Sequence, residues 1–528
     1  MNQILSKIFN KASRTLFFQK RYLRDFYNDI NYPLPNKERV LIYAGIGHMY
    51  LTPLEILMYH LLKKEGYEVD YYIYDQSIPI NEIITEDVIK ITDKDNFWKK
   101  SVHNAESLLK AANVKYDFIS LPPEINNLIA PVKDDLERIF TFEYDGIDFG
   151  ETVKAVMYRF YKSISFGENA MLRANEFLQT SLTNYFQIKK LFSRNRYKYV
   201  FFSHGIYCTW QPVLEYCKRN RISFVSYDRG KRSGTANFNI NQPSPDWSFN
   251  DAWIRYSNRE LTPEEEKKVD EYLSERELQK NDVYAYNFSK RSENSDAVKK
   301  LLNIDPHAKV ITIFTNLIWD AANVARDIAF PSALDCIEQT IKYFAGNKNV
   351  HILIRSHPAE KVIGTRERYD SLIKERFNDH LPANVTIIEP ELEINSFTVI
   401  DISDIGVVNT STVGLEFAML GKPVILISET HYRNKGFTYD GTSAEDYFNK
   451  IDFLLTHLAP MPEQVKLARK YFYMMMFLYQ KPIPIKFCEN YFEEYTVKNL
   501  NELSYEEPLY QVIRFLEKDN VKDFIFWE

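Results

Sequence analysis

Short apolar runs alternate with amphipathic stretches along most of this chain, and their order predicts alternating strands and helices. In the first half, the strand-length apolar runs lie at 40–44, 68–74, 117–121, 199–202 and 223–227. Residues with helical spacing separate them, and a capping threonine predicts a helix from Thr52 to Lys64. Alternation of this kind is typical of a parallel sheet covered by helices.

The second half repeats the pattern. Its strand-length apolar runs lie at 310–314, 350–354, 385–388, 405–408 and 424–427. Between the halves, residues 258–300 are rich in Glu and Lys at helical spacing, with a capping threonine and a proline at Thr262 and Pro263. A chain of 528 residues is too long for one core. The pattern therefore predicts an α/β protein with two Rossmann-like domains, each a doubly wound parallel sheet, facing a cleft.

This reading divides the chain into five segments. They are an amphipathic N-terminal helix at 1–30, a Rossmann-like acceptor domain with a helical insertion at 31–260, a linker helix at 261–300, a Rossmann-like donor domain at 301–445, and helices at 446–528 that pack back on the domains.

The first segment has two interpretations. Ile4, Leu5 and Ile8 alternate with Lys7 and Lys11, so a helix here would be apolar on one side and basic on the other. Such a helix can lie on an anionic membrane surface. It can equally dock on its own domain, and the sequence alone does not decide between these.

Composition limits the class of partner and the compartment. The net charge of −6 gives no bulk basic field for nucleic acid. The four cysteines form no CxxC pair, which is typical of reduced thiols in a cytosolic protein. There is no apolar run of membrane-spanning length and no signal-peptide pattern. We therefore expect a cytoplasmic protein, with peripheral contact at the inner membrane face as an option.

Hydroxyls and an acidic residue follow the apolar run that ends at Val408. A helix is predicted to begin at about Thr412, so Ser411, Thr412 and Gly414 would present hydroxyls and amides to a phosphate. Glu416, one turn further on, could accept hydrogen bonds from a ribose. The alternative is an ordinary capped helix with a glutamate in its first turn.

Two other strand ends of the second half are polar. Arg355 and His357 leave one strand two residues apart, so their side chains begin on the same side, and an arginine can clamp a phosphate. Pro358 fixes the turn, and the alternative is a structural histidine. Asn316, Trp319 and Asp320 follow the strand at 310–314 as possible sugar or phosphate contacts. Ligands of doubly wound sheets bind at the carboxyl ends of the strands.

The catalytic base is expected on the first domain. His204 follows the strand at 199–202, and an imidazole can take a proton from an acceptor hydroxyl near neutral pH. Asp228, at the next strand end, is the second candidate, although it could instead pair with a neighbouring arginine. Basic side chains that could contact an anionic acceptor or the donor phosphate are Arg229, Lys231 and Lys435.

Five blocks of sequence in order resemble the bacterial capsule polysaccharide biosynthesis family of glycosyltransferases, over roughly residues 200–440. The blocks are 314–321 (FTNLIWDA), 354–360 (IRSHPAE), 409–416 (NTSTVGLE), 421–424 (GKPV) and 432–438 (YRNKGFT). The resemblance implies a GT-B transferase that uses an activated sugar nucleotide. By similarity to Kdo and sialic acid transferases, which use cytidine-monophosphate sugars, His357 and Pro358 would meet the nucleotide. Ser411, Thr412 and Glu416 match the phosphate-contacting turn and its helix.

The expected partners are a nucleotide-sugar donor and a glycan or glycolipid acceptor. No cofactor and no metal are expected, because the one DxD-like sequence, Asp93-Lys94-Asp95, lies in a polar segment away from any strand end. Three alternatives stay open. They are a sugar-nucleotide 2-epimerase, a polyol-phosphate transferase of the teichoic-acid type, and a catalytically inactive GT-B scaffold.

Overall fold

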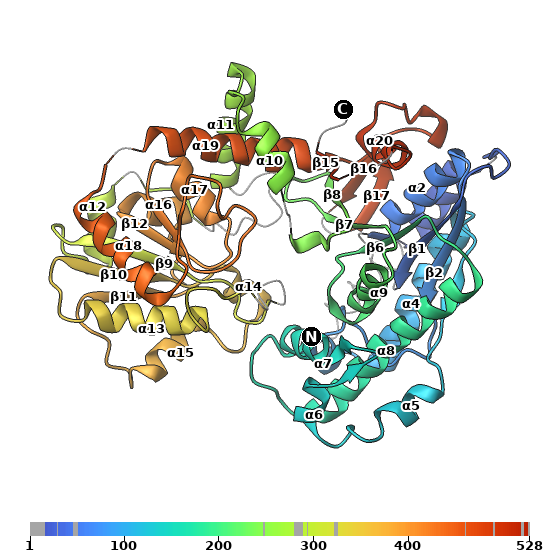
Figure 1. Ribbon diagram of the computed structural model, residues 1–528, viewed down its shortest axis with the longest axis horizontal. Helices are drawn as coiled ribbons and strands as arrows, with labels where there is room; N and C mark the ends of the chain where they lie inside the picture. The colour runs from blue at the N-terminus through green and yellow to red at the C-terminus, as the bar shows by residue number, and fades with distance from the viewer. Residues whose placement is uncertain are drawn as a thin grey trace.

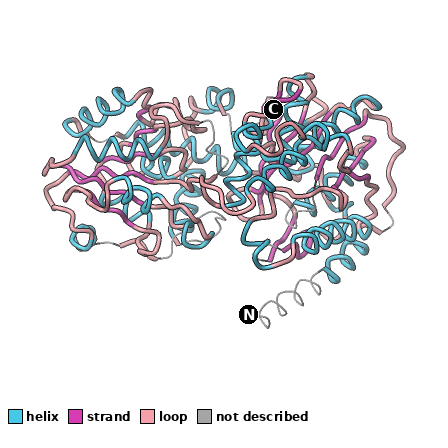
Figure 2. The backbone as a smooth tube through the Cα atoms, turned by 90° about the horizontal axis from the view of Figure 1, so that it is seen from below, coloured by secondary structure: helices cyan, strands magenta, loops and turns pink. Residues whose placement is uncertain are grey.

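The computed structural model shows two α/β domains that lie side by side along the long axis of the molecule (Figures 1 and 2). The described residues are 16–28, 30–45, 51–246, 249–278, 289–292, 294–320, 326–459, 461–488, 491–518 and 522–525. The first domain combines the N-terminal half of the chain with its C-terminal end, and the second domain is built from the residues between them.

The first sheet has seven strands in the order β15-β8-β7-β6-β1-β2-β3. They are β1 (Arg39–Gly45), β2 (Glu68–Tyr74), β3 (Asp117–Ile119), β6 (Tyr199–Ser203), β7 (Phe224–Arg229), β8 (Thr235–Ile240) and β15 (Lys481–Pro482). From β3 to β7 the strands are parallel, in the 3-2-1-4-5 arrangement of Rossmann-like sheets. β8 and β15 extend one edge as antiparallel strands.

Both faces of this sheet are buried. In β1, Val40 packs with α2 (Leu51–Lys64) and α20 (Pro508–Phe515), whereas Leu41 packs on the opposite face. The helices on that opposite face are α4 (Lys94–Ala111), α7 (Phe149–Tyr161), α8 (Ala170–Arg194) and α9 (Tyr207–Arg219). A strand covered on both sides is apolar at consecutive positions, which explains why the run at 40–44 predicted this strand.

The second sheet has six parallel strands in the order β11-β10-β9-β12-β13-β14. They are β9 (Lys309–Phe314), β10 (Val350–Arg355), β11 (Val385–Ile388), β12 (Ile405–Val408), β13 (Val424–Leu426) and β14 (Tyr439–Asp440). This is the full doubly wound 3-2-1-4-5-6 order. The prediction of two Rossmann-like parallel sheets is therefore confirmed.

Helices cover both faces of the second sheet as well (Figure 1). One core contains α13 (Ala333–Phe344), α15 (Tyr369–Arg376) and α18 (Ala444–Thr456). The other contains α11 (Pro263–Glu277), α12 (Ser295–Leu301), α16 (Ser396–Ile402), α17 (Val413–Met419) and α19 (Pro462–Tyr473). The remaining short elements are α3 (Glu86–Ile91), α5 (Glu124–Ile129), α6 (Leu136–Phe140), α10 (Asn250–Tyr256), α14 (Ala359–Ile363), β4 (Glu143–Tyr144), β5 (Ile147–Asp148) and two 3₁₀ turns, Ser244–Asp246 and Leu500–Glu502.

The C-terminal segment returns from the second domain to the first. α19 continues into a π-helix, Met474–Tyr479, and β15 then pairs with β8 in the first sheet. A hairpin of β16 (Ile485–Cys488) and β17 (Tyr491–Tyr495) and helix α20 follow. The sequence predicted only helices here, so these three strands were missed.

Helical residues 16–26 dock on the first domain. Leu23, Phe26 and Tyr27 are buried in its core, while Phe17 and Phe18 are 64% and 66% exposed. The part of the predicted amphipathic helix at 1–15 lies outside the described residues. Within the described residues, no helix has the length and apolar character needed to cross a membrane.

Candidate active site

The end of β6 orients the side chain of His204. His204 and Gly205 both have left-handed backbone conformations, with φ of 51° and 77°. The His204 amide donates to the Tyr227 carbonyl at 3.1 Å, and its ring stacks on Trp210 with centroids 5.2 Å apart. A Cβ on Gly205 would lie 2.8 Å from Leu214, so the tight turn requires glycine here.

The structure brings the two predicted base candidates into contact. The Nε2 of His204 lies 3.2 Å from the Oδ2 of Asp228, and its Nδ1 lies 2.5 Å from the Oγ of Ser203. Asp228 belongs to β7, the strand next to β6, which explains why the two strand ends meet. Both side chains are about a quarter exposed, at 26% and 24%. A carboxylate in this position fixes the tautomer of an imidazole and stabilises its protonated form.

The hairpin of β7 and β8 positions the basic residues that follow Asp228. Residues 228 and 229 belong to β7, so the loop between the two strands contains residues 230–234. The Arg229 amide donates to Asp228 Oδ1 at 2.6 Å. Arg232 lies over the Phe477 ring at 4.8 Å and donates to the Gln480 carbonyl, so it holds the returning C-terminal segment. Of this loop, Lys231 is directed at the second domain, where its charge lowers the pKa of His357.

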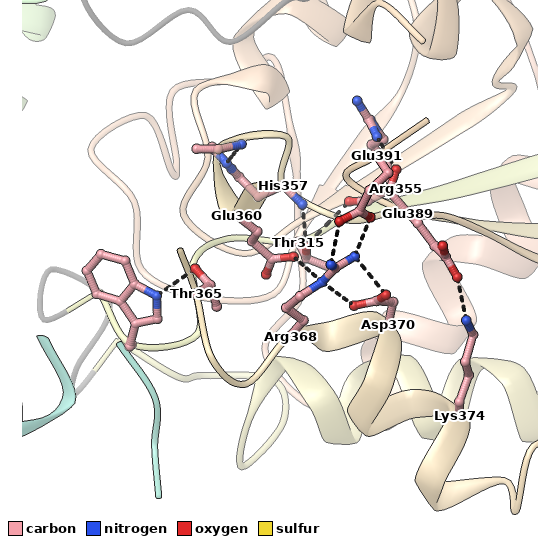
Figure 3. A network of polar contacts seen from close by, with 12 residues as sticks. Thr315, Arg355, His357, Glu360, Thr365, Arg368, Asp370, Lys374, Glu389 and Glu391 are labelled. Atoms are coloured by element: carbon pink, nitrogen blue, oxygen red, sulfur yellow. Dashed lines mark hydrogen bonds and ion pairs between the residues drawn. The ribbon is translucent and has the colours of Figure 1, made fainter. Parts of the chain in front are cut away.

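On the second domain, His357 caps the start of α14. Its Nδ1 accepts from the Ala359 amide at 3.1 Å, and its own amide donates to Thr315 Oγ1 at 3.1 Å (Figure 3). Burial, with the charges of Arg355, Lys231 and Arg276, lowers the pKa of His357 to about 4. The ring is therefore neutral near pH 7. Because Nδ1 accepts a hydrogen bond, the ring proton is on Nε2.

Arg355 differs from the prediction. Its side chain is 3% exposed, and its guanidinium donates to the carbonyls of Glu389 and Ile394 at 3.3 and 3.1 Å. Burial lowers its pKa to about 10. Instead of extending from the strand end as a phosphate clamp, Arg355 holds the loop at 389–394, because buried carbonyls require a donor.

Glu416 also differs. It is 3% exposed, and its Oε1 lies 2.6 Å from Nε of Arg276, which comes from α11. The predicted ribose contact is therefore replaced here by an ion pair between two helices. Packing explains the glycine at position 414. A Cβ there would lie 2.4 Å from the hydroxyl of Tyr432, which donates to the Ser411 carbonyl.

Ser411 and Thr412 stay partly exposed at the start of α17. The Ser411 hydroxyl accepts from the Val413 amide at 3.3 Å, and Thr412 makes no side-chain cap. Asn316 donates to the hydroxyl of Thr410 in the same turn. The strand ends of β9 and β12 therefore meet at these residues, as the sheet order requires.

Trp319 and Lys435 have structural partners. Trp319 is 6% exposed and donates from Nε1 to Thr365 Oγ1 at 2.9 Å. Lys435 is 8% exposed, and its Nζ donates to Asn250 Oδ1, which joins α10 to the loop after β13. Burial lowers the pKa of Lys435. The sequence predicted this lysine near the cleft rim, whereas the structure buries it.

Asp320 is directed at the first domain. Burial raises the pKa of Tyr207, Arg159 opposes this, and Asp320, Glu82 and Asp228 add to it, so that the pKa is raised to about 12. Arg159 lies 5.3 Å from the Tyr207 ring centroid. Tyr207, Arg159 and Glu82 were not predicted, because no motif marks them and tertiary packing of α9, α7 and the turn before α3 places them here.

A second histidine of the second domain was also missed. His431 Nδ1 lies 3.0 Å from the hydroxyl of Tyr471, which donates to the His431 carbonyl. Burial lowers the pKa of His431 well below its usual value, and Lys231, Arg326 and Lys435 lower it further. Lys231 therefore acts on both His357 and His431, and both rings are neutral near pH 7.

Comparison with known proteins gives one family and several distant structures. Residues 263–453 match the family described as capsule polysaccharide biosynthesis protein. No curated protein sequence matches the chain. Two similar structures are the β Kdo 2,4 and β Kdo 2,7 transferase parts of KpsC from Thermosulfurimonas dismutans. The first is 18% identical, covers 55% of this chain and 82% of its own, and has a TM-score of 0.36. The second is 13% identical, covers 63% of this chain and 90% of its own, and has a TM-score of 0.33.

A third similar structure is the UDP-GlcNAc 2-epimerase of Neisseria meningitidis, at 12% identity and a TM-score of 0.24. It covers 82% of this chain and 94% of its own. Similarity this distant supports no statement about ligands, and the fold assignment rests on the strand order of the two sheets.

Proposed function

We propose that this chain, whose residues 263–453 match the capsule polysaccharide biosynthesis family, is a GT-B glycosyltransferase. It transfers a sugar from a nucleotide-sugar donor to a growing surface polysaccharide or glycolipid. The observation that supports this most is the contact between His204 and Asp228 at neighbouring strand ends of the first sheet. Asp228 and Asp320 of the second domain both act on Tyr207, and Lys231 acts on His357 of the second domain.

The donor binds on the second domain in this proposal. Ser411 and Thr412 offer hydroxyls beside the start of α17, and His357 offers an Nε2 proton to a phosphate or a base edge. Lys231, from the first domain, adds positive charge on the same side. A cytidine-linked sugar is the expected donor. The leaving phosphate would be stabilised by these fixed charges and dipoles, without a metal ion.

The acceptor hydroxyl is activated on the first domain. Its oxygen bonds to the anomeric carbon of the donor while the bond from that carbon to the phosphate oxygen breaks. The hydroxyl proton passes to Nδ1 of His204, and the hydroxyl of Ser203 turns to the Tyr227 carbonyl, to which it can donate at 3.1 Å. The resulting imidazolium then faces the carboxylate of Asp228.

The acceptor suggests a location at the inner membrane face. Helical residues 16–26 expose Phe17 and Phe18 beside Arg21 and Arg24, while their opposite side is docked on the domain. Exposed aromatic rings beside cations suit an anionic lipid surface. We place the protein in the cytoplasm with peripheral contact at that membrane.

One assay tests the proposal against its alternatives. The protein is incubated with CMP-, UDP- and GDP-linked sugars and with CDP-polyols, with and without oligosaccharide or lipid acceptors, and free nucleotide is measured. A transferase releases nucleotide only when an acceptor is present. A 2-epimerase interconverts the sugar without any acceptor, and a polyol-phosphate transferase releases CMP from a CDP-polyol. A scaffold gives no turnover and no thermal shift with any nucleotide.

A further inference from the structure

The segment that follows the His357 turn docks on the first domain. α14 ends at Ile363, and residues 363–367 contact the start of α3 and the turn at 162–165, which follows α7. The chain itself passes between the domains elsewhere, near α10 and through the π-helix after α19. The contact at 363–367 is therefore a separate, noncovalent connection between the domains.

Glu367 makes the densest part of this contact. Its Oε2 accepts from the hydroxyl of Ser163 at 2.6 Å and from the amides of Ile164 and Ser165, each at 2.8 Å. Burial raises the pKa of Glu367, but the hydrogen bonds from the 163–165 turn outweigh it and lower the pKa below its usual value. Hydrogen bonds to a carboxylate are stronger than those between neutral groups, so this side chain anchors the segment.

Lys162 and Arg366 extend the contact on either side. The Nζ of Lys162 donates to the Ile363 carbonyl at 2.5 Å and pairs with Asp87 at 2.6 Å. The Arg366 amide donates to the Lys162 carbonyl at 3.0 Å, and its guanidinium pairs with Glu86 at 2.9 Å. Backbone and side chains of both domains thus fix the same five-residue segment.

The docked segment is joined directly to the proposed donor site. Only the single turn of α14 separates it from His357, whose Nδ1 caps that turn. Thr365 also accepts from the indole of Trp319, next to Asp320. A displacement of residues 363–367 therefore moves the turns that hold His357 and Asp320.

We propose that Glu367 is a positioning residue. When its carboxylate is seated in the turn at 163–165, the two domains are held in the arrangement that the structure shows, and the position of His357 relative to the His204–Asp228 pair is fixed. The position of Glu367 in this turn follows from its own hydrogen bonds and does not depend on the proposed function. Its consequence for sugar transfer rests on the proposed function.

The test measures the distance between the domains in the free protein. Spin labels are placed at Glu137→Cys on α6 and Glu375→Cys on α15, both exposed, in a Cys488→Ser background. Distances are then recorded by pulsed electron paramagnetic resonance. The parent protein should give one narrow distribution. Glu367→Ala should broaden it and lower the ratio of the docked to the undocked arrangement about tenfold, as expected for loss of hydrogen bonds to a charged group, while Glu367→Gln should lie between.

A matched control is Glu391→Ala, which removes an acidic side chain that pairs with Arg368 inside the second domain. It should leave the distribution narrow. If Glu367→Ala also leaves it narrow, the positioning role is wrong, whatever the protein catalyses. Binding of CMP and UDP is measured separately by calorimetry. If neither binds the parent protein, the donor-site proposal fails and the distance result still stands.

The pH dependence of the distance distribution gives a second measurement. Because the pKa of Glu367 is lowered in the docked state, its stabilisation is fully present above the usual carboxylate value of 4.5 and is lost as the pH falls below it. The distance distribution of the parent protein should broaden in that range. Glu86 and Asp87, which pair with Arg366 and Lys162, are further carboxylates of the same contact. The Glu367→Ala variant should therefore show a smaller step, and an equal step in both proteins would contradict the role of this carboxylate.

Discussion

The strand ends of the two domains differ in what their polar side chains contact. On the first sheet, His204 and Asp228 contact each other and stay about a quarter exposed, at 26% and 24%. On the second sheet, Arg355 and Glu416 are 3% exposed and are held by backbone carbonyls and by Arg276. Both pairs looked alike in the sequence, as polar residues after apolar runs.

This difference shows which polar groups can serve a ligand. A side chain whose hydrogen-bonding groups are satisfied by buried backbone cannot leave without a large free-energy penalty. At the second sheet this leaves small hydroxyls, one histidine and the cations that approach from other segments. The proposed donor site therefore depends on Ser411, Thr412, His357 and Lys231 more than on the residues that looked strongest in the motifs.

The largest change in stability is expected when the ion pair between Glu416 and Arg276 of the second domain is broken. Glu416→Ala removes the carboxylate partner of Arg276 at a site where both groups are mostly buried. We expect the free energy of unfolding to fall by about 3 kcal/mol. Urea unfolding measures this, with the Arg276→Ala and double variants completing the cycle. If Glu416→Ala leaves the stability unchanged but abolishes nucleotide binding, Glu416 contacts the ribose, as the sequence predicted.

The next effect concerns the first domain. Asp228→Asn keeps the shape of the side chain but cannot stabilise a protonated His204. The rate of sugar transfer should fall about 100-fold, with little change in nucleotide affinity or in the unfolding midpoint. Steady-state kinetics with varied donor separates kcat from KM. An increase in donor KM alone would place Asp228 in binding instead of proton transfer.

A somewhat smaller effect is expected at Arg355. Arg355→Met removes the donor to the carbonyls of Glu389 and Ile394. Leaving these groups without a partner should lower the free energy of unfolding by about 2 kcal/mol. Nucleotide affinity, measured by calorimetry on the folded variant, should change little. A variant with normal stability and weak nucleotide binding would show that this guanidinium reaches the donor.

The smallest effect is expected at the exposed rings of helical residues 16–26, which lie outside both sheets. Replacing Phe17 and Phe18 together by serine should reduce binding to vesicles containing phosphatidylglycerol about tenfold, because two exposed rings no longer insert. Co-sedimentation measures the bound fraction. Ile91→Ser, at a side chain 61% exposed on α3, is the control and should have no effect. Equal binding of all three proteins would contradict the membrane contact.

Most strands could be predicted because they are buried on both faces. β12 has the predicted bounds, since the run at 405–408 is buried throughout, contains no charged residue and ends at turn residues. β2 and β11 also have the predicted bounds, although both are only partly buried and β2 contains Glu68 and Asp70. β8 was missed because Asn237 and Asn239 are of a residue type that favours turns, although they alternate with apolar positions as in a strand and both side chains are buried. Its pairing with β7 depends on tertiary contacts that local sequence does not show.

The site was predictable only in part, for the same reason. Strand ends indicated His204 and Asp228, and the sheet order brings them together. The partner of Glu416 lies 140 residues away on α11, and the seat of Glu367 lies in a turn of the other domain. Neither position has a local signal, because burial and long-range pairing decide whether a polar residue holds the fold or meets a ligand.

In the proposed mechanism, the first domain activates an acceptor while the second holds a nucleotide sugar. The most direct measurement compares acceptor-dependent nucleotide release by the parent protein and by His204→Ala, together with nucleotide binding by each. The account predicts that release falls about 1,000-fold in His204→Ala while CMP or UDP binding is unchanged. Release at the parent rate by His204→Ala would contradict it.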